Sequence, residues 1–325
     1  MKIANWTIAA AAALSATGAL AGPIALPAGP YSLQYYNAEQ FSATNDINNM
    51  SGGKEGNWGI MQVSNIVKGT ALPPTGSDIQ GGGTPFFVDQ LFPIGGAQIL
   101  GMFYDIRHDA VGTTGTRSHG GKIDLYWWQG VAAQNVGTEL SSGANLAKRT
   151  AQNEYTGFTC ASGNTANCTF LGELTFEPGV EPGYPAATVF TPTDPQSLDG
   201  TSKSYLSVDT SKLGAWTTTL DGNYFTLDPC NNPVGKSYSP GDICPVTGLP
   251  VGGPGGVSMT AAQDVRLDNN FTRSGATAWD IAGTDTIGLR SNDPARGLAV
   301  PEPGSLALAG LALVGLAAIR RTRKV

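Results

Sequence analysis

Residues 121–129 read GKIDLYWWQ and give the strongest strand signal in the chain. β-Branched and aromatic residues favour strands, and four of them stand in this short stretch. Successive side chains of a strand point to opposite faces of a sheet, so Tyr126 and Trp128 share one face and Trp127 takes the other. We expect one set to be buried in the core. An outward-facing Trp127 or Trp128 would offer an aromatic surface on which a sugar ring could stack.

Glycine and proline are frequent on both sides of this stretch. The chain of 325 residues holds 44 Gly and 21 Pro, whereas charged residues make up 14% of it. This composition favours short strands and turns over long helices. Residues 215–228 read as a hairpin with a tight turn at Asp221-Gly222, and residues 135–153 are the best candidate for a short helix. Further strands are expected at 58–67, 98–105, 204–209 and 278–289.

These segments predict a mainly β fold, an antiparallel β-sandwich-like exported domain over residues 22–289. Long Gly/Pro-rich loops are expected at 177–195 and 245–256. An exported chain of this length can form one β domain or two, and we favour a single sandwich. Residues 290–299 are expected to be a linker.

Residues 300–325 consist of three blocks in order. A Pro-Glu-Pro triplet at 301–303 should stay extended and accessible, because prolines lack a backbone donor. An uncharged apolar run at 305–319 follows and predicts a transmembrane helix of about 22 Å, short of a bilayer core of about 30 Å. Cationic residues at the end would stay in the cytoplasm as a stop-transfer tail. These residues are Arg320, Arg321, Arg323 and Lys324.

This arrangement resembles the PEP-CTERM sorting signal of Gram-negative envelope proteins. The motif residues are Val300, Pro301, Glu302 and Pro303. The resemblance implies processing by an exosortase, a membrane enzyme, so that membrane anchoring is transient and the product reaches the cell surface or the extracellular matrix. It also implies a link to exopolysaccharide, biofilm or floc formation. The alternative is a plain C-terminal anchor that is not cut.

Residues 1–21 have the features of a secretory signal peptide. Lys2 gives a positive start, residues 8–20 are apolar, and Ala19 and Ala21 form a small-x-small cleavage site before Gly22. The alternative is a buried N-terminal helix. We expect the secretion machinery to export the chain across the inner membrane, with the precursor held there by its tail.

The expected exported portion, residues 22–319, is acidic, with 14 basic and 25 acidic residues and a formal charge of −11. This charge argues against nucleic acid as a partner and leaves hydroxyl-rich polymers such as extracellular polysaccharide. Four cysteines fit an oxidising compartment. Pairing of Cys160 with Cys168 and of Cys230 with Cys244 is the simplest of three connectivities, and zinc is the competing use.

Residues that could perform catalysis are few. The only two histidines, His108 and His119, stand near Asp109 and Ser118, so a Ser/His/Asp set exists on paper. Adjacent residues of a strand point apart, however, and the segment reads as a polar loop before residue 121. Asp-Gly-Asn at 221–223 and Asp-Asn-Asn at 268–270 offer oxygen ligands for calcium, but turns explain both. We expect no metal and no cofactor.

The sequence therefore predicts a non-enzymatic exported protein of the cell surface or extracellular matrix. A structural or adhesive role in exopolysaccharide, biofilm or floc formation is the first hypothesis. An envelope-attached polysaccharide hydrolase or a carbohydrate-binding module is the alternative.

Overall fold

The computed structural model describes residues 23–26, 30–68, 79, 84–88, 97–112, 115–129, 136–156, 160, 168–181, 184, 186–192, 199–222, 225–227, 261–291 and 295–299. Outside these residues lie the predicted signal peptide, residues 300–325 of the predicted sorting signal, and both Cys230 and Cys244. Among the described residues, no helix is both long and apolar enough to cross a membrane.

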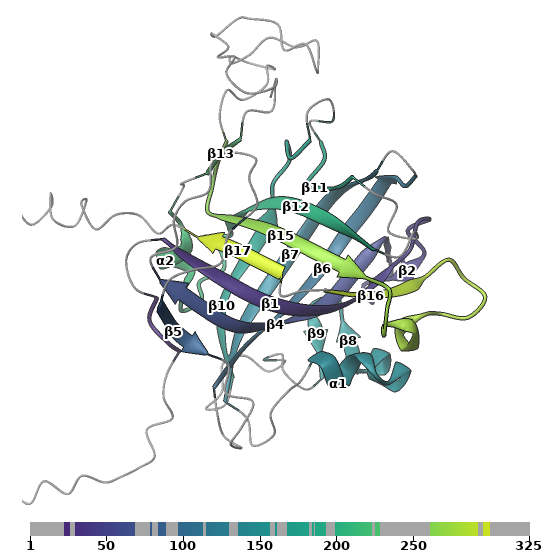
Figure 1. Cartoon of the computed structure of the whole chain (residues 1–325), viewed down its shortest axis with the longest axis horizontal. Helices are drawn as coiled ribbons and strands as arrows, with labels where there is room; N and C mark the ends of the chain where they lie inside the picture. The colour runs from purple at the N-terminus through teal and green to yellow at the C-terminus, as the bar shows by residue number, and fades with distance from the viewer. Residues whose placement is uncertain are drawn as a thin grey trace, which may run out of the picture.

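One large antiparallel sheet dominates the described part of the chain (Figure 1). Its strands are β1 (Tyr31–Phe41), β4 (Asn57–Lys68), β5 (Thr84–Val88), β6 (Gln98–Ala110), β7 (Thr116–Trp128), β10 (Cys168–Phe176), β11 (Val189–Thr191), β12 (Asp199–Val208), β15 (Val265–Thr272), β16 (Ile287–Ser291) and β17 (Ala295–Ala299).

Small elements surround this sheet. The two-stranded pairs are β2 (Ile47–Asn48) with β3 (Lys54–Glu55), β8 (Arg149–Ala151) with β9 (Glu154–Tyr155), and β13 (Phe225–Leu227) with β14 (Ala261–Gln263). The helical turns are α1 (Val136–Leu140), η1 (Gly143–Lys148), α2 (Thr217–Leu220) and η3 (Thr277–Trp279).

The large sheet closes on itself. From β1 the pairing runs through β4, β6, β7, β10, β12 and β15, and it returns to β1 through β16 and β17. The predicted sandwich of two facing sheets is therefore replaced by a single cylindrical sheet. Bulges bend the strands where the register shifts, for example between His108 and Ala110 of β6, opposite β7. Closure pairs the first strand with the last, which removes exposed edges.

The described residues of the segment predicted to be a linker, 290–291 and 295–299, belong to the sheet. Arg290 and Ser291 end β16, and β17 pairs with both β1 and β15. Ala295, Leu298 and Ala299 are buried. The sequence does not reveal this last strand, because a short apolar stretch that completes a closed sheet can have the same composition as a linker. The folded domain thus extends to residue 299.

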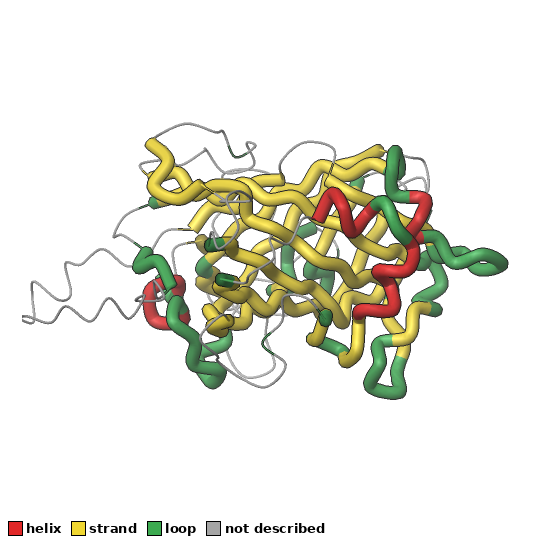
Figure 2. Tube along the Cα trace, turned by 90° about the horizontal axis from the view of Figure 1, so that it is seen from below, coloured by secondary structure: helices red, strands yellow, loops and turns green. Residues whose placement is uncertain are grey.

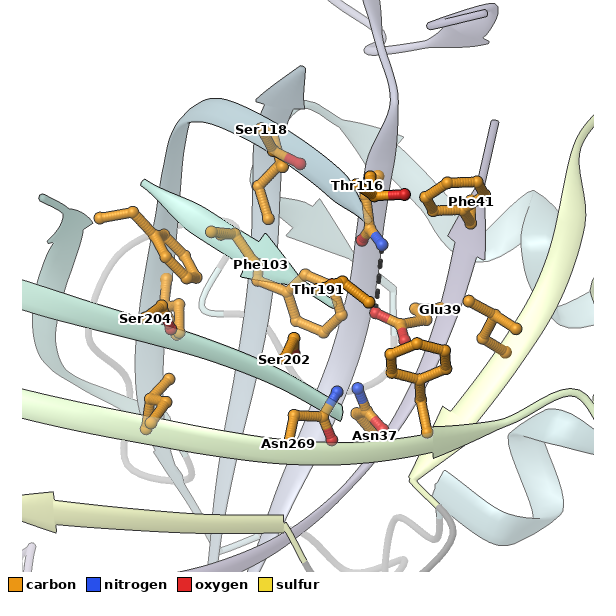
Figure 3. A pocket seen from close by; sticks show the side chains of 18 of the residues that line it. Asn37, Glu39, Phe41, Phe103, Thr116, Ser118, Thr191, Ser202, Ser204 and Asn269 are labelled. Carbon is orange, nitrogen blue, oxygen red and sulfur yellow. Dashed lines mark hydrogen bonds between the residues drawn. The ribbon is translucent and has the colours of Figure 1, made fainter. Parts of the chain in front are cut away.

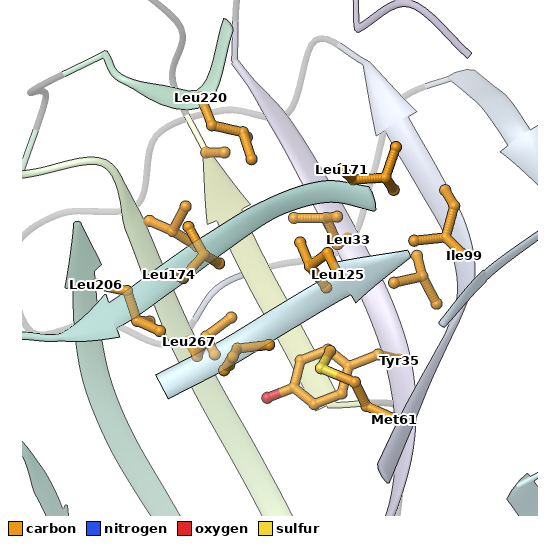
Figure 4. Packing of buried hydrophobic residues seen from close by; sticks show 14 of the residues in the cluster. Leu33, Tyr35, Met61, Ile99, Leu125, Leu171, Leu174, Leu206, Leu220 and Leu267 are labelled. Carbon is orange, nitrogen blue, oxygen red and sulfur yellow. The ribbon is translucent and has the colours of Figure 1, made fainter. Parts of the chain in front are cut away.

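The interior of the cylinder has an apolar half and a polar half. The apolar half holds buried side chains of many strands. Trp216, which precedes α2, and Leu220, the last residue of α2, pack against these side chains. Figure 4 shows several of these side chains converging: Leu33, Leu125, Leu171, Leu174, Leu206 and Leu220. The polar half lies around Asn37, Glu39, Asn57, His108, Ser118 and Asn269. Each long strand crosses from one half to the other.

A second layer covers part of the outer face of the sheet. Helix α1, η1 and η3 pack over β1, β4 and β6, and the Trp58 and Trp279 rings lie 5.6 Å apart in this layer. Glu55 and Arg149 form a buried ion pair, and the Arg149 guanidinium lies 4.4 Å from the centre of the Trp58 ring. Figures 1 and 2 place α1 and α2 towards opposite ends of the cylinder. Both faces of several strands are therefore buried.

Three local predictions differ from the structure. The strand expected at 278–289 forms only from Ile287, where β16 begins, because η3 and turns precede it. The hairpin expected at 215–228 is replaced by α2 and by β13, which pairs with β14. The tight turn at Asp221-Gly222 does not form, because Asp221 ends a helical turn there by donating its amide to Thr217. The helix expected at 135–153 is confined to α1 and η1, and β8 begins at Arg149. Ser141 and Ser142 separate α1 from η1.

Candidate functional site

The polar half of the interior encloses a cavity of about 80 Å³, counted as the space open to the centres of water molecules. Figure 3 shows side chains from β1, β6, β7, β11, β12 and β15 pointing into it. Along β1 the residues at 37, 39 and 41 share the inner face, since side chains alternate on a strand. The closed sheet thus brings polar groups from distant parts of the chain to one place.

Glu39 is the acidic group of this cavity. Its residue is 5% exposed, and its Oε2 accepts a hydrogen bond of 3.3 Å from Asn57 Nδ2 (Figure 3). Burial raises the pKa of the Glu39 carboxyl to about 7, and the hydrogen bond from Asn57 opposes this shift. No lysine or arginine is found among the described residues that line the cavity. Glu39 can therefore change its charge near neutral pH without a cation beside it.

Several other polar atoms in the wall have no partner. Asn37 Oδ1, Asn57 Oδ1, Asn269 Oδ1 and Thr116 Oγ1 are buried and make no hydrogen bond. Asn37 itself is only 2% exposed. A buried polar atom without a partner costs about 1–3 kcal/mol, and such atoms usually contact water or a ligand. The cavity is thus prepared to give hydrogen bonds to an occupant.

The histidines form two separate pairs. His108 Nδ1 lies 2.8 Å from Ser118 Oγ inside the cavity, whereas His119 Nδ1 lies 2.6 Å from Asp109 Oδ1 at the surface. They belong to β6 and β7, so the expected polar loop is instead a pair of strands. Burial lowers the pKa of His108 to about 4, which keeps its ring neutral at pH 7. The Ser/His/Asp set is thus split between the two faces of the sheet.

The two tryptophans that were predicted as possible sugar contacts do not stand open on the surface. Trp127 is 6% exposed and packs in the interior, with its ring 6.0 Å from that of Phe87. Trp128 points to the outer face, where it is partly buried against the second layer. Burial of one face of this strand was expected, and the structure covers both faces of this part of β7. Neither side chain forms an open aromatic surface.

A second buried polar cluster lies on the outer face of the sheet. Asp124 and Glu173 are opposite each other on β7 and β10, and Tyr104 Oη lies 3.4 Å from Asp124 Oδ2 and 3.2 Å from Glu173 Oε2. Lys122 and Lys212 both form ion pairs with Glu173. Burial raises the pKa of Asp124 to about 6, and the neighbouring Glu173 adds to the shift. Lysines and tyrosines already occupy these carboxylates, which is typical of a structural network.

The disulfide prediction is confirmed for the pair that the structure describes. Cys160 and Cys168 are bonded, with their Cα atoms 5.6 Å apart. This bond ties residue 160 to the first residue of β10. The predicted pair of Cys230 and Cys244 lies outside the described residues, so it stays a prediction. Among the described residues, no group of three or more His, Cys, Asp or Glu side chains is arranged to hold a metal ion.

The main residues of the cavity are not among the site residues that the sequence predicts. Asn269 was read as part of a turn, yet it lies within β15, opposite Ser202 of β12. Asn37 and Glu39 gave a usable signal, since they alternate with Tyr35 and Phe41 on β1. Such alternation shows that two polar residues share a face with aromatic ones, but not that this face is the inner one.

Residues 299–324 match the family described as the PEP-CTERM protein-sorting motif. The match confirms the predicted sorting signal and marks the chain as an exported protein that exosortase processes at the membrane. It covers the signal and not the sheet that precedes it. No curated protein and no solved structure matches the chain.

Proposed function

We propose that this protein acts outside the inner membrane as a non-enzymatic structural or adhesive component of the cell surface or the extracellular polymer matrix of a Gram-negative bacterium. The observation that carries the proposal is the sorting motif itself, which starts at the end of the folded domain. Ala299 is both the last residue of β17 and the first residue of the match. A folded cylinder is thus joined directly to the signal that exosortase acts on.

Two properties of the domain support an extracellular role. The Cys160–Cys168 disulfide fits an oxidising compartment. The closure of the sheet leaves few free strand edges, which suits a protein that must persist outside the cell without aggregating. Polysaccharide is the proposed partner of the outer surface. This agrees with a composition in which charged residues are few and acidic residues outnumber basic ones.

The test is the intact mass and location of the protein in its own host. The natural chain should lose its C-terminal segment and appear at the surface or in the matrix. A chain with Pro301→Ala, Glu302→Ala and Pro303→Ala should keep residues 305–325 and stay in the inner membrane. Glu177→Ala with Pro178→Ala is the matched control, since it changes the same residue types outside the motif, and it should behave as the natural chain does. Retention of the tail by the natural chain would refute the sorting part of the proposal.

The matrix role is tested separately by deleting the gene. Loss of floc or biofilm mass, restored by the natural chain and not by the triple variant, would support it. Unchanged biofilm and floc formation would contradict it. Turnover of the host's own polymer by the purified protein would favour the polysaccharide hydrolase instead, and Ser118→Ala, at the only serine paired with a histidine in the described cavity, would then be the first variant to assay.

A further inference from the structure

Thr116 Oγ1 and His108 Nε2 are buried in the cavity wall without a partner, but the three other unsatisfied atoms of the wall share one chemical character. Asn37 Oδ1, Asn57 Oδ1 and Asn269 Oδ1 are amide oxygens, which accept hydrogen bonds and cannot donate them. They come from β1, β4 and β15, so only the closed sheet brings them together. An occupant that satisfies them must be a donor.

The charge of the cavity has one sign. At alkaline pH, Glu39 is the charged group among the described residues of the cavity wall. Its carboxylate accepts a hydrogen bond from the neutral side-chain amide of Asn57. A buried carboxylate is costly unless a cation pairs with it. The occupant that removes this cost carries a positive charge.

Aromatic rings complete the wall. Phe41, Phe103 and Phe271 line the same cavity, and Figure 3 shows the Phe41 and Phe103 side chains around Glu39. The face of an aromatic ring attracts a cation, by about 0.5–2 kcal/mol. The apolar rings also favour an occupant with a short hydrocarbon part.

The volume limits the size of the occupant. A cavity of about 80 Å³ on this measure has room for roughly five to eight water molecules, at about 10–15 Å³ each. A small organic molecule fits this space, and a polymer segment does not.

We propose that the polar half of the interior is a binding site for a small primary ammonium ion, held by the Glu39 carboxylate and by the side-chain oxygens of Asn37, Asn57 and Asn269. The ammonium group carries the charge that the site lacks, and its three N–H bonds reach the carboxylate and two of the three asparagine oxygens at a time. Its hydrocarbon part lies against the phenylalanine rings. This site is independent of where the protein is delivered.

Other occupants fit less well. An anion would face the Glu39 carboxylate with no cation of the wall to hold it. A neutral polyol would satisfy the amide oxygens but leave the carboxylate without a counter-charge. A divalent metal usually takes several carboxylates, and the described residues contain no such cluster.

The experiment compares three probes of similar size and different charge. Ethanolamine, ethylene glycol and glycolate are titrated into the full chain by calorimetry at pH 8, where the Glu39 carboxyl is ionised because its pKa is about 7. Ethanolamine should bind with a Kd between tens of micromolar and about 1 mM, since about 1.5 kcal/mol per non-hydrogen atom is the ceiling for so small a ligand. The two other probes should bind at least tenfold more weakly.

Variants assign the binding to the cavity. Glu39→Gln and Asn37→Leu should each weaken ethanolamine binding tenfold or more, whereas Glu177→Gln, at a glutamate outside the cavity wall, should not. Circular dichroism establishes that each variant is folded. Equal or tighter binding of ethylene glycol or glycolate would overturn the proposal, as would ethanolamine binding that survives Glu39→Gln. Absence of binding by a folded natural chain up to several times the expected Kd would overturn it too.

Discussion

The two halves of the interior are built from the same strands but have opposite contents. On β12, Leu206 lies in the apolar half, where it is fully buried among other hydrophobic side chains. Ser204, two residues earlier on the same face, lines the cavity. The apolar half encloses a smaller cavity, of about 30 Å³, whose described wall consists of hydrophobic side chains and Tyr35. The polar half keeps about 80 Å³ of open space together with unpartnered oxygens, at a cost in stability. The difference supports the proposal that the polar half binds a ligand.

The largest expected effect is that of Trp127→Ala in the apolar half. This substitution should lower the free energy of unfolding by about 3–5 kcal/mol, because it removes a large buried ring. Tyr36→Ala, at an aromatic residue that is 43% exposed on β1, is the control and should cost far less. Urea denaturation measures both. A small loss for Trp127→Ala together with a loss of sugar binding would instead restore the carbohydrate-contact hypothesis.

Leu206→Ala and Ser204→Ala compare the halves directly on one strand. The first should cost about 2–5 kcal/mol through the cavity that it creates. The second should cost about 1 kcal/mol or less, because its side chain already borders open space. Equal costs, measured by the same denaturation experiment, would show that the polar half is packed as tightly as the apolar half.

Glu39→Gln should stabilise the protein at alkaline pH. The pKa of Glu39 is raised by burial from 4.5 to about 7, so its contribution to stability is fully present below pH 4.5 and is lost as the pH rises through 7. At pH 8 the variant should gain up to about 3 kcal/mol over the natural chain, and at pH 4 close to nothing. Denaturation at both pH values tests this. Equal effects at pH 4 and pH 8 would contradict a buried, titrating carboxyl.

His108→Gln should change the pH dependence of stability in the direction opposite to Glu39→Gln. Burial lowers the pKa of His108 from 6.5 to about 4, so its contribution is present above pH 6.5 and is lost as the pH falls through 4. The variant should gain stability relative to the natural chain between pH 6.5 and pH 4, by an amount of about 3 kcal/mol or less. The slopes of Glu39 and His108 oppose each other in this window. His108→Gln should therefore make stability fall more steeply with rising pH in this window than it does in the natural chain, and denaturation at several pH values measures this.

The limits of sequence reasoning are clear at particular residues. The strand at 121–129 and the disulfide of Cys160 with Cys168 were predictable, because each depends on neighbours in the chain. Trp127 and Trp128 point to opposite faces, as alternation predicts, but alternation does not show what covers either face. Asn269 was read as a turn residue because asparagine is common in turns, but pairing with β12 extends the strand through it.

The sequence by itself determined the sorting signal at 299–324 and the mainly β, antiparallel character of the domain. Both are carried by local order: a linear motif is recognised as an extended segment, and strand propensity and turns act over a few residues. Only the tertiary structure decided that the sheet closes, that residues 295–299 complete it, and that Glu39 and three asparagines meet in one cavity. These features depend on pairing between strands far apart in the chain, which no local pattern encodes.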